Sequence, residues 1–258
     1  MALSSLQYLC GLGSGSLVGL SLGLVGGGGS ILATPLMVYA VGVRDPHLAI
    51  GTSALAVAAN AFANLLNHAR CGRVKWRCAG LFAVAGVVGA LAGSTLGKVV
   101  DGKRLLFLFA ILMLGVGVLM LRRKSAVGDP GVQLSRRNAP KILAAGASAG
   151  ALSGFFGIGG GFLIVPALMV STGMPILNAV GSSLVAVTAF GLTTALNYAL
   201  SGWVDWGLAG VFLAGGVVGG LVGAHLAKRL ADHKGALATV FAGLIFVVAL
   251  YVLYRTTT

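Results

Sequence analysis

Acidic residues are scarce in this chain, and glutamate is absent. Among 258 residues there are five acids, all aspartate, and charged residues make up 9% of the chain, where a soluble domain carries roughly 25%. No aspartate lies inside an apolar run, and Asp205 only borders one. A membrane-embedded hydrolase would need paired acids or a metal, and a proton relay would need carboxylates within the membrane. The sequence therefore predicts a protein that is not an enzyme and that uses no cofactor or metal ion.

Cysteine is also rare, with three residues at Cys10, Cys71 and Cys78. An odd number without paired spacing argues against a disulfide framework and against a zinc site. We expect these thiols to be small packing residues.

Hydrophobic residues, in contrast, make up 57% of the chain. In water such a chain would expose more apolar surface than a soluble fold tolerates, so we expect it to lie in a lipid bilayer. The formal net charge of +13 is of the kind that nucleic-acid-binding proteins carry. Here the basic residues stand at the ends of apolar runs and no soluble domain is present, so we expect no nucleic-acid partner. These features predict a multi-pass membrane protein.

Apolar runs divide the chain into about eight segments, which predicts an all-α bundle of transmembrane helices. A spanning helix needs roughly 20 apolar residues, and all but the first and fifth runs fit one helix each. Those two are too long for one crossing and too short for two, and each has a glycine cluster near its middle. We therefore expect a broken or re-entrant helix in the first segment of each half. The runs cover residues 6–43, 47–68, 76–98, 104–121, 141–174, 176–201, 205–229 and 235–254.

A hydrophilic stretch separates two copies of one pattern. Residues 122–140 combine clustered charge with Gly and Pro and predict a cytoplasmic linker between a first transmembrane repeat at 1–121 and a second at 141–258. The glycine clusters and Pro35 match their second copies at an offset of 131 residues, and later positions match at an offset of 130. The later matches include Gly51 with Gly181, Asn67 with Asn197, and Val74-Lys75-Trp76 with Val204-Asp205-Trp206.

Basic residues favour an inverted orientation of the two halves. If each long run crosses the membrane an even number of times, 13 basic residues lie on the cytoplasmic side and 5 outside. If each long run crosses once, the halves are parallel and the division is 11 to 7. The larger asymmetry favours inverted repeats, which are a common transporter design, and the parallel arrangement is the alternative.

Two glycine-rich breaks that are followed by proline are the strongest candidates for a functional site. They read GGGGSILATP at 26–35 and GIGGGFLIVP at 157–166. Non-helical backbone survives in a membrane only where protein or a water-filled cavity surrounds it, and the start of a half-helix attracts an anion. Two such breaks in equivalent positions indicate a transporter binding site. The alternative is that the glycines only permit close helix packing.

A polar stripe follows the break in each half. Ser53, Asn60 and Asn64 share one helix face. Amides and hydroxyls are costly in hydrocarbon without partners, so we expect this face to point into the bundle. There the asparagines either line a path for a solute or bind neighbouring helices, and both roles are open. The corresponding positions of the second half are Ser183, Phe190 and Thr194.

Other glycines recur at every fourth position and predict faces on which helices approach closely, within the chain or in a homodimer. They are Gly11, Gly15, Gly19 and Gly23, with Gly146, Gly150 and Gly154 in the second half, and Gly89, Gly93 and Gly97, with Gly219 and Gly223. We assign no chemistry to these positions.

Residues 157–187 read GIGGGFLIVPALMVSTGMPILNAVGSSLVAV, and residues 26–57 are a looser copy, GGGGSILATPLMVYAVGVRDPHLAIGTSALAV. Together with residues 67–76 they resemble the sulfite exporter TauE/SafE family of membrane permeases over nearly the whole chain. The resemblance implies an inner-membrane transporter of small oxyanions or organic anions, with sulfite, sulfonates and related sulfur compounds as typical substrates. The first copy departs from the family pattern at Gly27 and Ser30, and by one inserted residue between Pro35 and Gly51.

These observations predict a permease that moves a small anion, most favourably a sulfur oxyanion or organosulfonate such as sulfite, by alternating access between two repeats. A passive anion channel and a non-transporting scaffold or assembly factor are the alternatives. A neutral site rich in hydrogen-bond donors suits an anion that must be released again. The candidate substrate-binding residues are Gly27, Gly28, Gly29, Thr34, Pro35, Thr52, Ser53, Asn60, Asn64, Gly159, Gly160, Gly161, Pro166, Ser182, Ser183 and Thr194.

Overall fold

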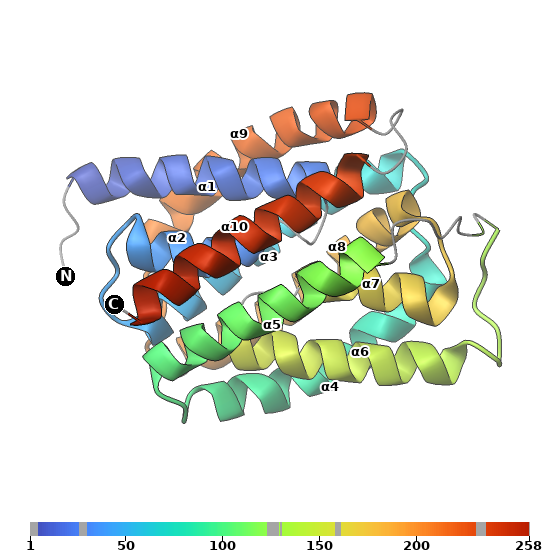
Figure 1. Cartoon of the computed structure of the whole chain (residues 1–258), viewed down its shortest axis with the longest axis horizontal. Coiled ribbons are helices and arrows are strands. Elements are labelled where there is room, and N and C mark those ends of the chain that lie inside the picture. Colours follow the sequence, from blue (N-terminus) through green and yellow to red (C-terminus); the bar gives the residue numbers. More distant parts are fainter. Residues whose placement is uncertain are drawn as a thin grey trace.

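The computed structural model describes residues 5–25, 30–122, 129, 131–157, 161–230 and 236–257, and within these ranges the chain is helical and contains no strand. The all-α prediction is therefore confirmed for the described residues. Figure 1 shows the helices as one elongated bundle. They are α1 (Ser5–Val25), α2 (Ala33–Tyr39), α3 (Pro46–Arg70), α4 (Trp76–Gly97), α5 (Gly102–Arg122), α6 (Ala139–Phe156), α7 (Gly161–Thr172), α8 (Ile176–Ala199), α9 (Trp206–Leu230) and α10 (Ala236–Thr257).

Four helices in the described part of the chain are long and apolar enough to cross a membrane. They are α3, α4, α8 and the Trp206–Leu226 part of α9. The helices α3 and α8 contact each other at the centre of the bundle, and more of their surface is buried than that of α4 and α9. A polar residue on α3 or α8 can therefore face protein rather than lipid.

The remaining helices surround this central pair in a regular way. Helix α1 packs along α9, α6 packs along α4, and α5 lies beside α10 on one face of the bundle (Figure 1). Phe82 of α4 stacks on Phe190 of α8, with ring centroids 6.2 Å apart, inside the larger of two apolar clusters. The second cluster lies where α5 and α10 meet α7, around Phe109 and Phe162.

Glycines set the distance between α1 and α9 and between α6 and α4. A Cβ atom added to Gly19 would overlap the backbone of Gly216, and one added to Gly150 would overlap the backbone of Gly86. Without side chains at these positions the backbones approach closely and gain dispersion contacts along their length. The prediction that these glycines form packing faces is confirmed.

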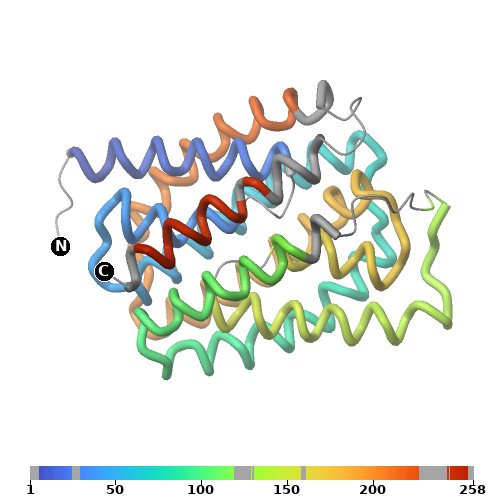
Figure 2. Tube along the Cα trace, viewed as in Figure 1, coloured from blue at the N-terminus to red at the C-terminus, as the bar shows by residue number. Residues whose placement is uncertain are grey.

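Each of the two long apolar runs contains two helices and begins and ends at the same end of the bundle. The side chain of Gln7, near the start of α1, donates a hydrogen bond to the Val41 carbonyl beyond α2 (3.3 Å). The backbone N–H of Asp129, in the linker, donates to the carbonyl of Gly173 beyond α7 (3.0 Å). The tube in Figure 2 shows α1 and α6 starting at opposite ends. The predicted interruptions at 26–29 and 158–160 themselves lie outside the described residues.

The Lys98 end contains the loops 40–45, 98–101 and 200–205, which are joined by the stacking of His47 on Trp203 and by hydrogen bonds from Lys98 to residues 197 and 201. The Arg73 end contains the loops 71–75 and 173–175, which are joined by a hydrogen bond from Asn178 to the Arg73 carbonyl.

Candidate functional site

The segments that follow the two glycine-rich breaks meet in the interior of the bundle. The hydroxyl oxygen of Ser30 accepts a hydrogen bond from the backbone N–H of Gly161 (3.2 Å). Ser30 is fully buried, and Gly161 is the first residue of α7. The two residues are equivalent under the offset of 131 that the repeated sequence follows. The predicted residues Gly27, Gly28, Gly29, Gly159 and Gly160 lie outside the described residues.

A second buried contact joins α2 to α3 next to this point. The hydroxyls of Thr34 and Ser53 lie 3.0 Å apart. The Ser53 hydroxyl donates to the carbonyl of Ile50 (3.1 Å), so the Thr34 hydroxyl is left to donate to Ser53. Both side chains are about 1% exposed. Ser53 stands seven residues, roughly 10 Å, inside a helix that crosses the membrane.

The two predicted prolines are both buried in the short helices. Pro35 lies in the first turn of α2, where its missing N–H costs little. Pro166 lies inside α7, where it cannot donate to the carbonyl of Phe162. That carbonyl is therefore a backbone acceptor freed within the bundle interior.

Two predicted hydroxyls are engaged by loops instead. The Thr52 hydroxyl accepts from the backbone N–H of Asp205 (3.0 Å), and the Ser182 hydroxyl accepts from the backbone N–H of Lys75 (2.9 Å). These bonds fix the loops before α9 and α4, at opposite ends of the bundle. The Ser183 hydroxyl donates to the carbonyl of Val180 in its own helix (2.7 Å). A role for these three residues in binding stays a prediction.

The asparagines of the polar stripe face α9. The Asn64 side chain donates to the carbonyl of Asn60 (2.9 Å) and lies against Gly220. Asn60 is 0% exposed and lies against Gly216, and neither atom of its amide has a hydrogen-bond partner among the described residues. It stands fourteen residues, roughly 21 Å, along a 25-residue helix, near mid-depth of the membrane.

Thr194 is the counterpart of Asn64 on α8 and is in the same situation. It is 0% exposed, and its hydroxyl has no partner within the ranges that the structure describes. An unsatisfied buried hydroxyl or amide costs about 1–3 kcal/mol. Asn60 and Thr194 therefore have hydrogen-bonding capacity that no described residue uses. Phe190, which occupies the position equivalent to Asn60, fills the corresponding space against Gly86 with an aromatic ring.

Lys98 closes the apolar run 76–98, and sequence reasoning used it only in the count of basic residues on the two sides of the membrane. Its ammonium donates to the carbonyl and side-chain oxygens of Asn197 (2.6 and 2.7 Å) and to the Ser201 hydroxyl (2.8 Å). The Asn197 amide in turn donates to Ser94 and Thr95 of α4 (2.7 and 3.2 Å). Desolvation lowers the pKa of Lys98 below its ordinary value. The cluster ties the end of α4 to the end of α8. The match of Asn67 with Asn197 between the two copies was the sequence signal that could have indicated this cluster.

We expect Lys98→Met to lower the apparent melting temperature of the detergent-solubilised protein by a few degrees, because about 1 kcal/mol of charge-assisted hydrogen bonding is lost at this half-buried site. Differential scanning fluorimetry measures the shift. Lys103→Met is the matched control, because the exposed Lys103 ammonium makes no hydrogen bond to the described residues. An equal shift in both variants would contradict the structural role of Lys98.

Metal binding finds no support among the described residues, where no group of three His, Cys, Asp or Glu side chains comes together. The described core instead presents hydroxyls and backbone groups at the starts of α2 and α7, and asparagine amides between α3 and α9. Such groups suit a solute that is bound by hydrogen bonds. Fold and site together define a multi-pass membrane protein with a buried polar centre.

Comparison with known proteins assigns the chain to a family. The model of the sulfite exporter TauE/SafE family matches residues 11–252, so the chain belongs to that family of membrane transporters. A probable membrane transporter protein of Xylella fastidiosa (strain 9a5c) is 55% identical over 245 residues, which are 95% of this chain and 94% of that protein. The probable membrane transporter protein YdhB of Bacillus subtilis is 28% identical over 223 residues, 83% of this chain and 88% of its own. No solved structure matches the chain.

Proposed function

We propose that this permease moves a small anion, most favourably a sulfur oxyanion or organosulfonate such as sulfite, by alternating access between two inverted repeats. The observation that carries the proposal is the buried hydrogen bond between Ser30 and Gly161, which brings the starts of two short helices together away from both membrane surfaces. The N-terminus of α7 is the positive end of a helix dipole, and its first N–H group, that of Gly161, is held by the Ser30 hydroxyl. An anion at this place is stabilised without any charged side chain.

Several contacts support a two-fold relation between the proposed repeats. Helix α1 packs on α9 as α6 packs on α4, and along the chain α6 follows α1, and α9 follows α4, by about the offset of the repeated sequence. Thr52 binds the backbone of Asp205 as Ser182 binds the backbone of Lys75. The first helices of the two halves start at opposite ends of the bundle (Figure 1), as inverted repeats require. Two such units can rock about a central site and open it to each side in turn.

The charge distribution supports an orientation with the Arg73 end in the cytoplasm. Among the residues whose side chains the structure describes, this end carries Arg70, Arg73, Lys75, Arg77, Arg136, Arg137 and Lys141 together with Asp129, and the Lys98 end carries Arg44, Lys98, Lys103 and Arg104 together with Asp45, Asp101 and Asp205. Cytoplasmic loops are enriched in Lys and Arg. We therefore propose that the Lys98 end faces the periplasm.

The proposal is tested by flux into proteoliposomes that contain the purified protein. We expect saturable, protein-dependent uptake of at least one anion among sulfite, sulfate, thiosulfate and small sulfonates. Thr34→Val keeps the shape of the side chain and removes the hydroxyl that donates to Ser53, so we expect it to lower uptake about tenfold or more. Ser148→Ala is the matched control, because this exposed hydroxyl only bonds its own helix.

Three results would overturn parts of the proposal. Uptake no faster than in protein-free liposomes for every anion would contradict anion transport. Uptake that does not saturate would indicate a passive channel. Normal saturable uptake in Thr34→Val would remove this hydroxyl from the binding site.

A further inference from the structure

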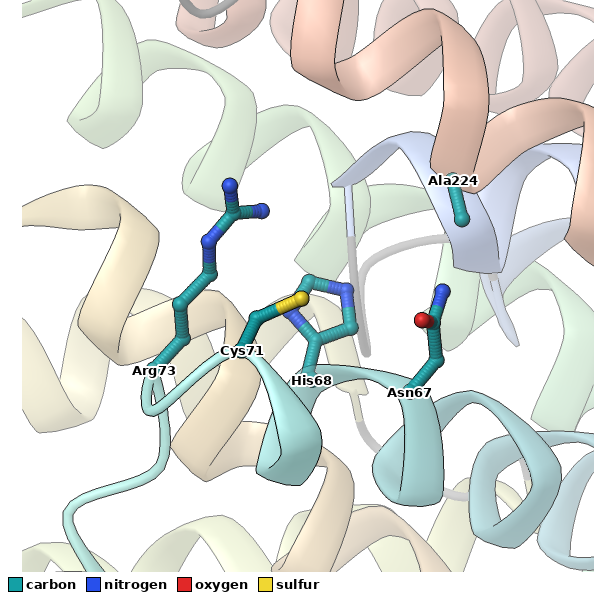
Figure 3. Close-up of a pocket in the computed structure, with 5 residues that line it drawn as sticks. All are labelled: Asn67, His68, Cys71, Arg73 and Ala224. Carbon is teal, nitrogen blue, oxygen red and sulfur yellow. The ribbon is translucent and has the colours of Figure 1, made fainter.

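A small pocket lies at the Arg73 end, away from the buried centre described above. It is half-enclosed and is lined by Asn67, His68, Cys71 and Arg73 with Ala224 of α9 (Figure 3). A tight turn shapes it. Gly72 adopts φ +67°, which favours glycine, and the Arg73 N–H donates to the His68 carbonyl (3.2 Å). The turn places the backbone of Arg73 beside the last turn of α3.

The pocket contains polar groups without partners. His68 is 5% exposed, and its Nδ1 atom has no hydrogen-bond partner in the described ranges. The Arg73 guanidinium is half-buried and makes no hydrogen bond or ion pair with any described residue. Because the Arg73 guanidinium lines a pocket and has no carboxylate partner among the described residues, it is available to bind an anion from outside the chain. Arg70, Lys75 and Arg77 nearby raise the local positive potential.

The opposite end of the bundle shows what these groups lack. There the Asn197 amide donates to Ser94 and Thr95 of α4. At the offset of 130, Asn67 takes the place of Asn197, and Ala224 and His225 take the places of Ser94 and Thr95. Figure 3 shows the Asn67 amide directed toward Ala224, whose methyl group accepts no hydrogen bond. Among the described residues the Asn67 side chain, unlike that of Asn197, therefore has no hydrogen-bond partner.

We propose that this pocket binds a small oxyanion, with Arg73 as the charged donor and Asn67 and His68 as neutral partners. Sulfate, sulfonate and phosphate share the required chemistry, which is several acceptor oxygens around one negative centre. Anion binding here does not depend on transport. Its use as the docking point on the cytoplasmic side of the path rests on the proposed function.

Cys71 provides a direct reporter, because it lines the pocket and is exposed. In a Cys10→Ala/Cys78→Ala background, Cys71 is the single thiol and its alkylation by the uncharged reagent N-ethylmaleimide can be followed by mass spectrometry. We expect saturating sulfate or methanesulfonate to slow alkylation about fivefold or more, and chloride at equal ionic strength to have little effect. Sulfite is not used here, because it reacts with maleimide.

Two arginine variants decide whether the pocket is responsible. Arg73→Gln should abolish the protection while the protein stays monodisperse. Arg137→Gln removes the same charge from an exposed site at the same end and should leave protection intact. Protection that persists in Arg73→Gln would overturn the proposal. The proposal would also be overturned if no oxyanion slowed the alkylation of Cys71 in the Cys10→Ala/Cys78→Ala protein.

Further measurements distinguish a free anion from a lipid headgroup. They also distinguish failure of this pocket from failure of the proposed function. Protection by sulfate in lipid-free, uncharged detergent indicates a free anion. Slow alkylation that appears only in nanodiscs with phosphatidylglycerol indicates a lipid headgroup in the same pocket. Protection should persist in Asn60→Leu, which alters only the buried centre. Loss of protection in this variant would show that Cys71 reports a distant conformational change, and it would overturn the proposed pocket. Protection without flux in proteoliposomes would overturn the proposed function and leave the pocket standing.

Discussion

Gly19→Ala should lower the apparent melting temperature of the detergent-solubilised protein by about 10 °C, or prevent recovery of folded protein. The added methyl group would overlap the backbone carbonyl of Gly216, and neither helix backbone can rotate away from it. Overpacking of a rigid interface costs about 1–3 kcal/mol and sometimes more, and each kcal/mol corresponds to roughly 2–4 °C. The interface is long, so a local separation of α1 from α9 weakens the neighbouring contacts of Gly15 and Gly23 as well. Differential scanning fluorimetry and size-exclusion chromatography measure the outcome.

Two further alanine variants make this result specific. Gly13→Ala lies on the same helix and finds no atom within 4 Å, so it should leave the melting temperature unchanged or raise it slightly. Gly150→Ala places the same methyl group against Gly86 and should reproduce the loss. A Gly19→Ala protein as stable as Gly13→Ala would contradict the close approach of α1 and α9.

Asn60→Leu should abolish transport and leave the folded protein at least as stable as before. The Asn60 amide is fully buried and has no partner among the described residues, so the native protein keeps a group that costs about 1–3 kcal/mol. Leucine has a similar volume and removes that cost. If the amide contacts the anion on its path, the same change removes a donor from mid-membrane and fills its place with hydrocarbon. Flux in proteoliposomes and the melting temperature are measured on the same preparation.

The control for this variant is Thr193→Val on α8, whose hydroxyl bonds only the Ala189 carbonyl of its own helix. It should keep both transport and stability. Normal flux in Asn60→Leu would show that the amide lies off the path. A large drop in melting temperature would show that the amide has a structural partner, and the residue would then be a link between helices.

The helix class and the glycine packing faces could be predicted because they depend on local spacing. Residues four apart on a helix share a face in any tertiary arrangement, so Gly15, Gly19 and Gly23 were recognisable as one surface. The identity of the partner helix is a property of the whole bundle, and no local pattern indicates that α9 meets α1.

The candidate site was less predictable, because its hydroxyls were selected by sequence and their directions were not known. Thr52 and Ser53 are neighbours on α3 and point about 100° apart, so one helix face cannot hold both. The structure turns Thr52 toward the loop at Asp205 and Ser53 toward Thr34. In the second half Ser182 likewise binds the loop at Lys75, and the fully buried Ser183 hydroxyl donates to the Val180 carbonyl of its own helix. Two adjacent hydroxyl residues in each half therefore indicate one side chain that binds the backbone of a loop and one that is buried in the bundle.

Long side chains were the other limit of sequence reasoning. Lys98 and Arg73 both stand in short connections, where the number of basic residues indicates orientation and little else. The four-carbon stem of Lys98 reaches Asn197 and Ser201 on another helix, whereas the Arg73 guanidinium finds no described partner. Their different situations follow from residues that lie about a hundred positions away in sequence.

The Ser30–Gly161 hydrogen bond joins two unlike residues at equivalent positions of the proposed repeats. A pair of identical half-length chains related by an exact dyad would have to place either two serines or two glycines there. Two serines would crowd two side chains into one small space, and two glycines would leave no hydroxyl. Gene fusion removes that restriction, since each copy can then mutate alone. The departure of Ser30 from the glycine of its family pattern is thus a change that a duplicated, fused chain can accept and a symmetric dimer cannot, and it places a single hydroxyl at the centre of the molecule.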